Sequence, residues 1–154
     1  MIQIKTGFLS PSNRDPLYFI KRDLVAGAVV ELGGARALVI DDDPDVRALL
    51  CFALDQQGIH ASEAEDGQSA LALLEADRFD VLITDVCLPP PMNGIETVRR
   101  ARKLSPTLRS LFISGAAPAT QDHPILDDFV SKPFKIDEVV GCLLELWFRK
   151  APLA

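Results

Sequence analysis

The sequence predicts an α/β domain in which five parallel strands and their crossover helices form a doubly wound sheet. Two short apolar runs, 37–40 and 81–84, each precede an aspartate, which is typical of strands buried on both faces of a sheet. Segments with helical spacing of apolar residues alternate with the strand-like segments, and the connections between them are short. This alternation implies parallel strands joined by right-handed crossovers.

The first strand and the first helix of the domain follow one another closely. Strand 37–41 precedes a helix that begins at about Pro44, a residue suited to the first helical position, with Asp43 as the N-cap. The helix ends at about Gln57, before Gly58. Its apolar stripe, which we expect to face the sheet, is formed by Leu49, Leu50, Ala53 and Leu54.

The middle of the chain repeats this alternation. Strand 59–64 has a weaker pattern, and a second helix begins after Asp66 and Gly67. The third strand ends at Asp85, and a helix over about 94–104 follows it. We therefore expect three complete strand–helix units before the fourth strand begins.

The last part of the chain completes the sheet with strands 110–114 and 129–131 and a helix over about 136–149. The segment between these two strands is short and contains Pro118 and Pro124. Each proline removes a helical donor and clashes with the preceding turn. We therefore expect a shortened or irregular fourth helix.

Domain limits follow from where this pattern starts and stops. We expect one folded domain over 35–150 and a short tail over 151–154. Residues 1–34 are expected to form an N-terminal extension. Within it, the apolar piece 24–32 fits a short helix ended by glycines, and it fits equally a strand-like segment near Val29 and Val30.

Composition narrows the class of protein. The chain has 154 residues, 48% apolar and 25% charged, with a net charge of −6, which argues against nucleic acid as a direct partner. Its three cysteines are scattered and show no metal-ligand or disulfide spacing, which fits a reducing cytoplasm. No apolar stretch approaches the roughly 20 residues that a membrane span needs. We expect a cytoplasmic protein without a membrane partner.

Four of the predicted strands leave a polar residue at the carboxyl edge of the sheet, where open α/β sheets bind ligands. These residues are Asp41 to Asp43, Asp85, Ser114 and Lys132. Carboxylates held this close repel one another, and a divalent cation with oxygen ligands, Mg²⁺ or Mn²⁺, relieves the repulsion. A metal, an ammonium and a hydroxyl supply the charge neutralisation that phosphoryl transfer needs. The pocket is thus suited to receiving a phosphoryl group.

With these residues in this order, the chain from Arg36 to Lys150 resembles the receiver domain of two-component response regulators. The resemblance implies a flavodoxin-like fold with strand order 2-1-3-4-5. It implies a signalling protein rather than an enzyme, phosphorylated by a histidine kinase or a phosphotransfer protein and read by a downstream protein partner. The loop from Asp85 to Gly94 is one residue longer than the usual family pattern, and the segment 115–128 is shorter.

The resemblance also implies the roles of the acids. Asp85 matches the phosphoacceptor. Asp41 and Asp42 match the pair that holds Mg²⁺ together with Asp85, with Asp42 preferred as the direct ligand. Cys87 falls where the family supplies a backbone carbonyl to the metal.

Three further positions match the part of the family's site that holds and reports the phosphoryl group. Lys132, in a Lys-Pro-Phe motif, and Ser114 match the residues that bind the phosphoryl oxygens. Ser114 and Phe129 match the hydroxyl and the aromatic residue of the conformational switch.

Two other functions remain open from the sequence. One is a protein-interaction module that keeps this fold and works without phosphorylation. The other is a phosphatase with an aspartyl nucleophile after the first strand, which would use Asp41 and Asp43. Asp45 stands two residues after Asp43, where that class has Thr or Val.

The last helix carries more apolar surface than one stripe requires. Cys142, Leu146 and Phe148 lie outside the main stripe of this helix. Either the N-terminal extension covers them, or they form the interface of a homodimer or of another partner.

Overall fold

The computed structural model describes residues 2–3, 30–31, 34–115 and 128–149. Its main sheet is parallel and has five strands in the order β4-β3-β5-β6-β7, which is the predicted order 2-1-3-4-5. The strands are β3 (Arg36–Ile40), β4 (His60–Ala64), β5 (Val81–Thr84), β6 (Arg109–Ser114) and β7 (Asp128–Ser131). The described helices are α2 (Pro44–Gln56), α3 (Gly67–Ala76), α4 (Gly94–Leu104) and α5 (Ile136–Arg149).

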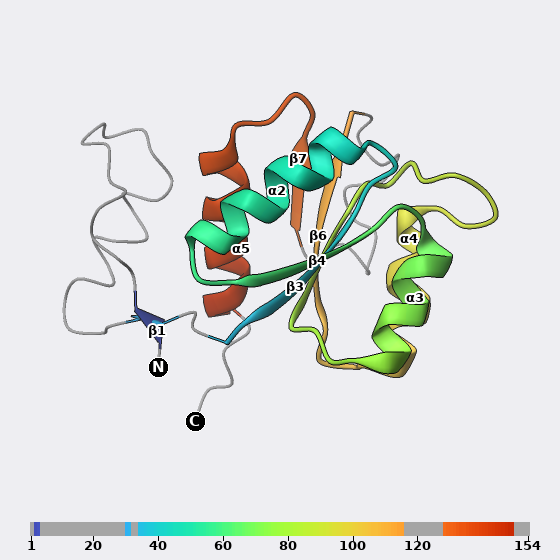
Figure 1. The fold of residues 1–154 in the computed structure, drawn as a ribbon, viewed down its shortest axis with the longest axis horizontal. Coiled ribbons are helices and arrows are strands. Elements are labelled where there is room, and N and C mark those ends of the chain that lie inside the picture. The colour runs from blue at the N-terminus through green and yellow to red at the C-terminus, as the bar shows by residue number, and fades with distance from the viewer. Residues whose placement is uncertain (1, 4–29, 32–33, 116–127, 150–154) are drawn as a thin grey trace.

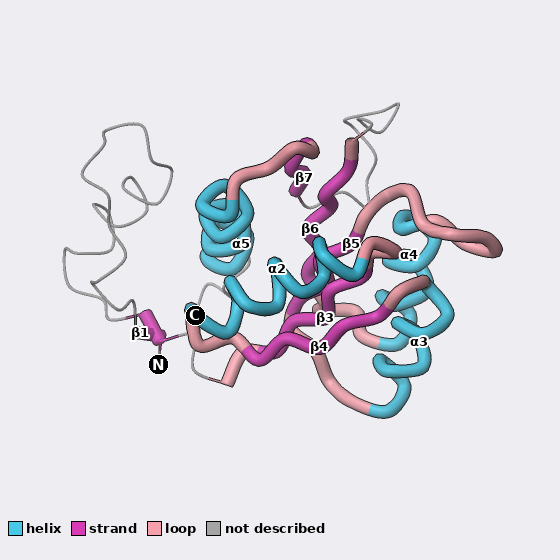
Figure 2. The backbone as a smooth tube through the Cα atoms, turned by 45° about the horizontal axis from the view of Figure 1, so that its top comes forward, coloured by secondary structure: helices cyan, strands magenta, loops and turns pink. Residues whose placement is uncertain are grey.

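The sheet lies between two helical layers. α2 and α5 cover one face, and α3 and α4 cover the other (Figures 1 and 2). Alternate residues of the central strands therefore enter different cores: Val39 and Ile83 pack under α2 and α5, whereas Leu38 and Leu82 pack under α3 and α4. Because both faces of the sheet are buried, the sequences of its central strands are continuous apolar runs.

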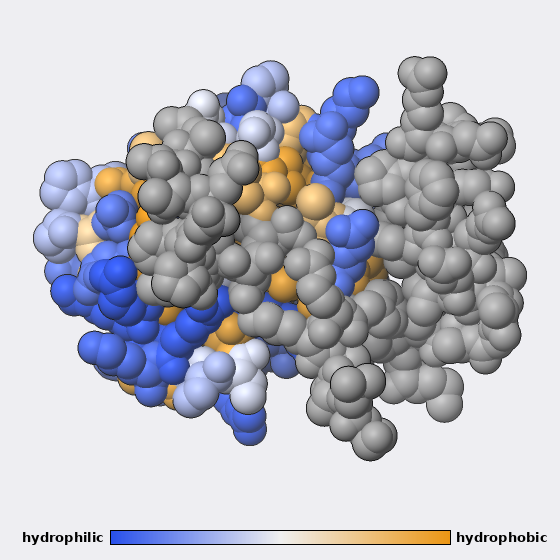
Figure 3. Space-filling model, turned by 180° about the vertical axis from the view of Figure 1, so that it is seen from behind, coloured by the Kyte–Doolittle hydropathy of each residue, from blue (hydrophilic) through white to orange (hydrophobic). Residues whose placement is uncertain are grey.

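The outer surface of the α3–α4 layer is polar. Arg99, Arg100 and Lys103 are exposed on α4, and Glu96 pairs with the two arginines at 2.6 and 2.9 Å. Hydrophilic side chains gather over this end of the molecule when it is seen from behind (Figure 3). No helix in the described parts of the chain is both long enough and apolar enough to cross a bilayer.

Each of the helices α2, α3 and α4 begins at a capping residue. Asp43, Asp66 and Asn93 accept hydrogen bonds from backbone amides of the first turn, as is usual for N-caps. Gly58 follows α2 with φ of 79°, a left-handed conformation that favours glycine. The predicted start and end of this helix are confirmed to within one residue.

The cap of α3 gives a testable contribution to stability. Asp66 Oδ1 accepts from the Ser69 amide at 2.8 Å, and this bond lowers the pKa of Asp66. Asp66→Ala should reduce the free energy of unfolding at pH 7 by about 1 kcal/mol. Because the folded-state pKa is depressed, the charged cap contributes fully above the ordinary pKa of 3.8 and loses its contribution as pH falls through the folded value.

Urea unfolding of wild type and Asp66→Ala at pH 7 and at pH 3 measures this contribution. The difference between the two proteins should shrink at pH 3. Asp66→Asn is the matched control, since an uncharged amide keeps the hydrogen bond at both pH values. An equal difference at both pH values would show that the carboxylate charge plays no part.

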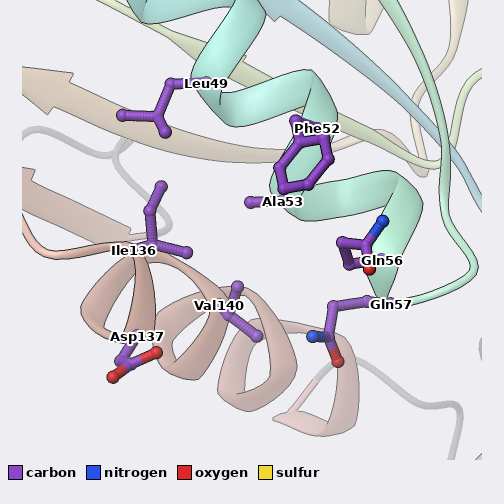
Figure 4. Close-up of a pocket in the computed structure, with 8 residues that line it drawn as sticks. All are labelled: Leu49, Phe52, Ala53, Gln56, Gln57, Ile136, Asp137 and Val140. Carbon is purple, nitrogen blue, oxygen red and sulfur yellow. The ribbon is translucent and has the colours of Figure 1, made fainter. Parts of the chain in front are cut away.

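One position of the expected α2 stripe is wrong. Leu49 is 47% exposed, whereas Leu50 and Leu54 are buried. Leu49 lies about 100° around the helix from Leu50, at the edge of the arc that faces the sheet. Together with Phe52, which is 65% exposed, it lines an apolar groove between α2 and α5 (Figure 4). The side chains of the described residues leave this groove open.

The expected division of apolar residues on α5 is also wrong at Leu146. This residue is 1% exposed and belongs to the core under α2 and α5. It lies seven residues, or two turns, beyond buried Val139, so it shares the core-facing side of the helix. Cys142 is half-buried against the same core. Leu146 therefore needs no partner to cover it.

Some predictions fall on residues outside the described ranges. The fourth helix concerns 116–127, and most of the extension lies in 4–29. Within 24–32 the structure describes only β2 (Val30–Glu31), which pairs in parallel with β1 (Ile2–Gln3), so the choice between helix and strand for the rest of this piece lies outside the described residues.

Candidate functional site

Two buried aspartates leave the sheet side by side at its carboxyl edge. Asp41 follows β3 and Asp85 follows β5, and the residues before them, Ile40 and Thr84, are partners in the strand register. The Asp85 amide donates to the Ile40 carbonyl at 3.0 Å. This bond continues the backbone hydrogen bonding between β3 and β5 by one residue beyond the end of β5. Asp41 is 2% exposed and Asp85 7%. The predicted juxtaposition of the two carboxylates is confirmed.

Lys132 bridges these two aspartates. Its backbone amide, directly after β7, donates to the Ser114 carbonyl at 2.9 Å. Its ammonium Nζ lies 2.8 Å from Asp41 Oδ2 and 2.7 Å from Asp85 Oδ2. Burial alone would lower the pKa of Lys132, but the hydrogen bonds and negative charges of the two aspartates outweigh it and raise the pKa above 10.5. The lysine is therefore charged at neutral pH.

Asp42 brings a third carboxylate to the same place. One oxygen from each of Asp41, Asp42 and Asp85 lies within 4.8 Å of the others. Three carboxylates around one ammonium leave a net negative charge, and their hard oxygen atoms are the ligands that Mg²⁺ and Mn²⁺ prefer. Asp42 is exposed, so water has access to the site. The residues fit a hard divalent cation.

Ser114 lies at the end of β6 and is 1% exposed. Its Oγ has no hydrogen-bond partner among the described residues. This buried hydroxyl belongs to the residue whose carbonyl accepts from the Lys132 amide, so it lies at the same edge of the sheet as the lysine.

The remaining two predicted positions are Cys87, in the loop after β5, and Phe129, on β7. Cys87 is exposed, and its backbone amide donates to Asp85 Oδ1 at 2.9 Å. Phe129 on β7 is half-buried and packs against the core under α3 and α4. The structure thus places the backbone of Cys87 at the carboxylate of Asp85.

The loop that follows Asp85 closes back on itself. The Gly94 amide donates to the Val86 carbonyl at 2.8 Å, and Met92 is buried. The peptide bond between Pro90 and Pro91 is cis, and both prolines are exposed. Pro90 and Pro91 therefore lie on the surface, while the two ends of the loop meet beside the acids.

Arg47 was not singled out from the sequence, yet it contacts the acidic loop. Its Nη1 donates to the Asp41 carbonyl at 2.7 Å, and its Nε lies 3.3 Å from Glu63 Oε1. The usable signal was its place at the end of the first turn of a helix that directly follows the acids. A long cationic side chain there can reach back to the loop.

A family model and curated relatives point to the same protein family for this chain. A family model described as the response regulator receiver domain matches residues 37–143. The response regulator receiver protein CpdR of Brucella abortus is 37% identical over 110 residues, which cover 69% of this chain and 91% of CpdR. The probable transcriptional regulatory protein TcrX of Mycobacterium tuberculosis is 37% identical over 108 residues, 67% of this chain but only 45% of TcrX.

Solved structures agree with these relatives. The chemotaxis response regulator CheY4 of Vibrio cholerae aligns with a TM-score of 0.67 and 26% identity, over 73% of this chain and 98% of CheY4. The response regulator TrrA of Thermotoga maritima, solved in complex with Mg²⁺ and BeF, aligns with a TM-score of 0.66 and 28% identity, over 73% of this chain and 98% of TrrA.

Proposed function

This chain belongs to the response regulator receiver domain family, and from that premise we propose that Asp85 accepts a phosphoryl group from a phosphohistidine. The donor is a partner histidine kinase or phosphotransfer protein. The protein acts as a signalling receiver whose phosphorylated form is read by a downstream protein partner. The receiver domain spans residues 35–150 in this proposal.

One observation supports the proposal most directly, and it is the bridge that Lys132 makes between Asp41 and Asp85. A fixed ammonium beside a buried carboxylate nucleophile is placed to neutralise charge on an incoming phosphoryl oxygen. Positioning and charge neutralisation supply most of the catalysis in phosphoryl transfer.

The proposed reaction has a simple balance. A carboxylate oxygen of Asp85 attacks phosphorus, the P–O bond forms, and the P–N bond to histidine breaks. The electron pair goes to the imidazole nitrogen, which takes up a proton from solvent. Lys132 and Ser114 then donate hydrogen bonds to the phosphoryl oxygens. Movement of Ser114 toward the phosphoryl group, followed by Phe129, biases the surface that the downstream partner reads.

Asp42, Asp85, Asp41 and the backbone carbonyl of Cys87 are the groups that would hold Mg²⁺ or Mn²⁺. When bound, the cation would reduce the repulsion between the carboxylates and the phosphoryl oxygens. The chain's own part is to keep these oxygens close together and partly open to water. The three carboxylate oxygens within 4.8 Å of one another support this assignment.

The phosphatase alternative finds less support. Asp43, which would be the acid of that class, is exposed, and its side chain accepts from the Asp45 amide at 2.9 Å as the N-cap of α2. It is not one of the three clustered carboxylates. Its position is explained by the helix that it caps.

Incubation with acetyl phosphate and Mg²⁺, followed by intact mass spectrometry, tests the proposal. Wild type should gain one phosphoryl mass, and Asp85→Asn should gain none, because the amide lacks the nucleophilic oxygen. Asp55→Asn, an exposed position on α2, is the matched control and should be phosphorylated like wild type.

A phosphoryl mass that persists in Asp85→Asn would overturn the choice of nucleophile. If wild type gains no phosphoryl mass and shows no Mg²⁺-dependent rise in Tm, the proposal is refuted, and the alternative of a phosphorylation-independent interaction module is supported. A cation that binds only the folded state must raise Tm, so the second measurement is decisive.

A further inference from the structure

The acidic loop between β3 and α2 is held from outside the carboxylate cluster by Arg47. The guanidinium donates to the carbonyl of Asp41, which belongs to the peptide joining Asp41 to Asp42, at 2.7 Å. Asp41 and Asp42 supply two of the three clustered carboxylates. The orientation of this one peptide therefore affects the directions in which both side chains leave the backbone.

Arg47 is itself held at two points. Its backbone amide donates to the Asp43 carbonyl at 3.1 Å in the first turn of α2, and its guanidinium pairs with Glu63 on β4 at 3.3 Å. Only 13% of its side chain is exposed. A planar guanidinium can donate in two fixed directions at once, which an ammonium cannot do in the same geometry. Arg47 thus connects the helix, the neighbouring strand and the acidic loop.

We propose that Arg47 is a positioning residue that sets the metal-binding geometry of Asp41 and Asp42. The inference rests on the proposed function, since it concerns the same acids. Mg²⁺ demands a near-ideal octahedron of oxygen ligands, so a small rotation of the Asp41–Asp42 peptide reduces its affinity. Groups that orient ligands without touching the metal commonly change affinity 10- to 100-fold.

Charge alone predicts the opposite effect. Arg47 is a cation beside a cation site, so its removal should strengthen Mg²⁺ binding if it acts only through its charge. If it acts by holding the loop, its removal should weaken binding. The sign of the change in affinity therefore separates the two explanations.

The experiment measures Tm of the whole chain as a function of Mg²⁺ concentration, which gives an apparent Kd for the metal. Arg47→Met should raise this Kd about 10-fold. Arg47→Lys keeps the charge but loses the planar guanidinium that donates in two fixed directions, so it should also raise the Kd. Arg100→Met, which removes an exposed cation on α4, should bind Mg²⁺ like wild type.

An unchanged or lower Kd in Arg47→Met overturns the proposal, and so does wild-type affinity in Arg47→Lys. Should Arg47→Met fail to fold, Arg47→Lys decides by the same criterion. Wild type without any Mg²⁺-dependent rise in Tm would instead refute the metal site and the proposed function. A rise in wild type with equal affinity in the variants refutes only the role of Arg47.

Discussion

Gly94→Ala should unfold this domain or leave it barely stable. A Cβ added at Gly94 would lie 2.0 Å from the carbonyl oxygen of Asp85 and 2.9 Å from its carbonyl carbon. Both are backbone atoms, so no side chain can rotate away to relieve the overlap. Overpacking of a core normally costs about 1–3 kcal/mol, and we expect about 4 kcal/mol or more here because backbone must move.

The same change reaches the site directly. The Gly94 amide donates to the Val86 carbonyl, so α4 begins in contact with the backbone of Asp85, the proposed phosphoacceptor, and of Val86, the residue after it. Any remaining folded Gly94→Ala protein should be phosphorylated slowly, because the carboxylate of Asp85 moves with its backbone.

Urea unfolding monitored by circular dichroism measures the loss of stability. Gly115→Ala is the matched control, since an added Cβ there meets no atom of the described residues within 4 Å. It should change the free energy of unfolding by less than about 1 kcal/mol. An unfolding midpoint of Gly94→Ala equal to that of wild type would contradict the close approach of the two backbones.

The parts of the site that could be predicted are those set by strand ends. A parallel sheet brings the residues after β3 and β5 together whatever the side chains are, so the meeting of Asp41 and Asp85 follows from alternation alone. The caps of α2 and α3 were equally predictable, because Asp43 and Asp66 compete well for first-turn amides. Both are local or topological properties.

What could not be predicted depends on distances between side chains of different elements. Whether Lys132 contacts one aspartate or both depends on where its Nζ lies between them, which is 2.8 Å from Asp41 Oδ2 and 2.7 Å from Asp85 Oδ2. The exposure of Leu49 depends on how far α2 lies from α5, which no property of either helix determines. The burial of Leu146 is different, because its spacing of two turns from Val139 in the sequence already places it on the core-facing side of the helix.

Lys132→Met should destabilise the protein and at the same time make it more responsive to Mg²⁺. Without the ammonium, the buried carboxylates of Asp41 and Asp85 face each other with no counter-charge. Breaking a buried ion pair costs about 3–5 kcal/mol, and we expect about 3 kcal/mol at pH 7 because a quarter of the lysine side chain is exposed.

The raised pKa of Lys132 determines the pH at which the loss of stability in Lys132→Met should be measured. A group whose folded-state pKa is raised contributes its full stability below its unfolded pKa, here 10.5, and loses it as pH rises through the folded value. Neutral pH therefore reports the whole contribution of the lysine. The difference between wild type and Lys132→Met should disappear only in strongly alkaline solution.

When Mg²⁺ is added, Lys132→Met should gain more thermal stability than wild type, but it should be phosphorylated less. The cation can replace the missing positive charge between the carboxylates, so the Mg²⁺-dependent rise in Tm should be larger than in wild type. Phosphorylation by acetyl phosphate should nevertheless fall by about 100-fold, since the proposed donor to the phosphoryl oxygens is gone. Lys135→Met, at a nearby exposed lysine, should match wild type in both measurements. Normal phosphorylation of Lys132→Met would mean that the bridge between the aspartates serves the fold alone.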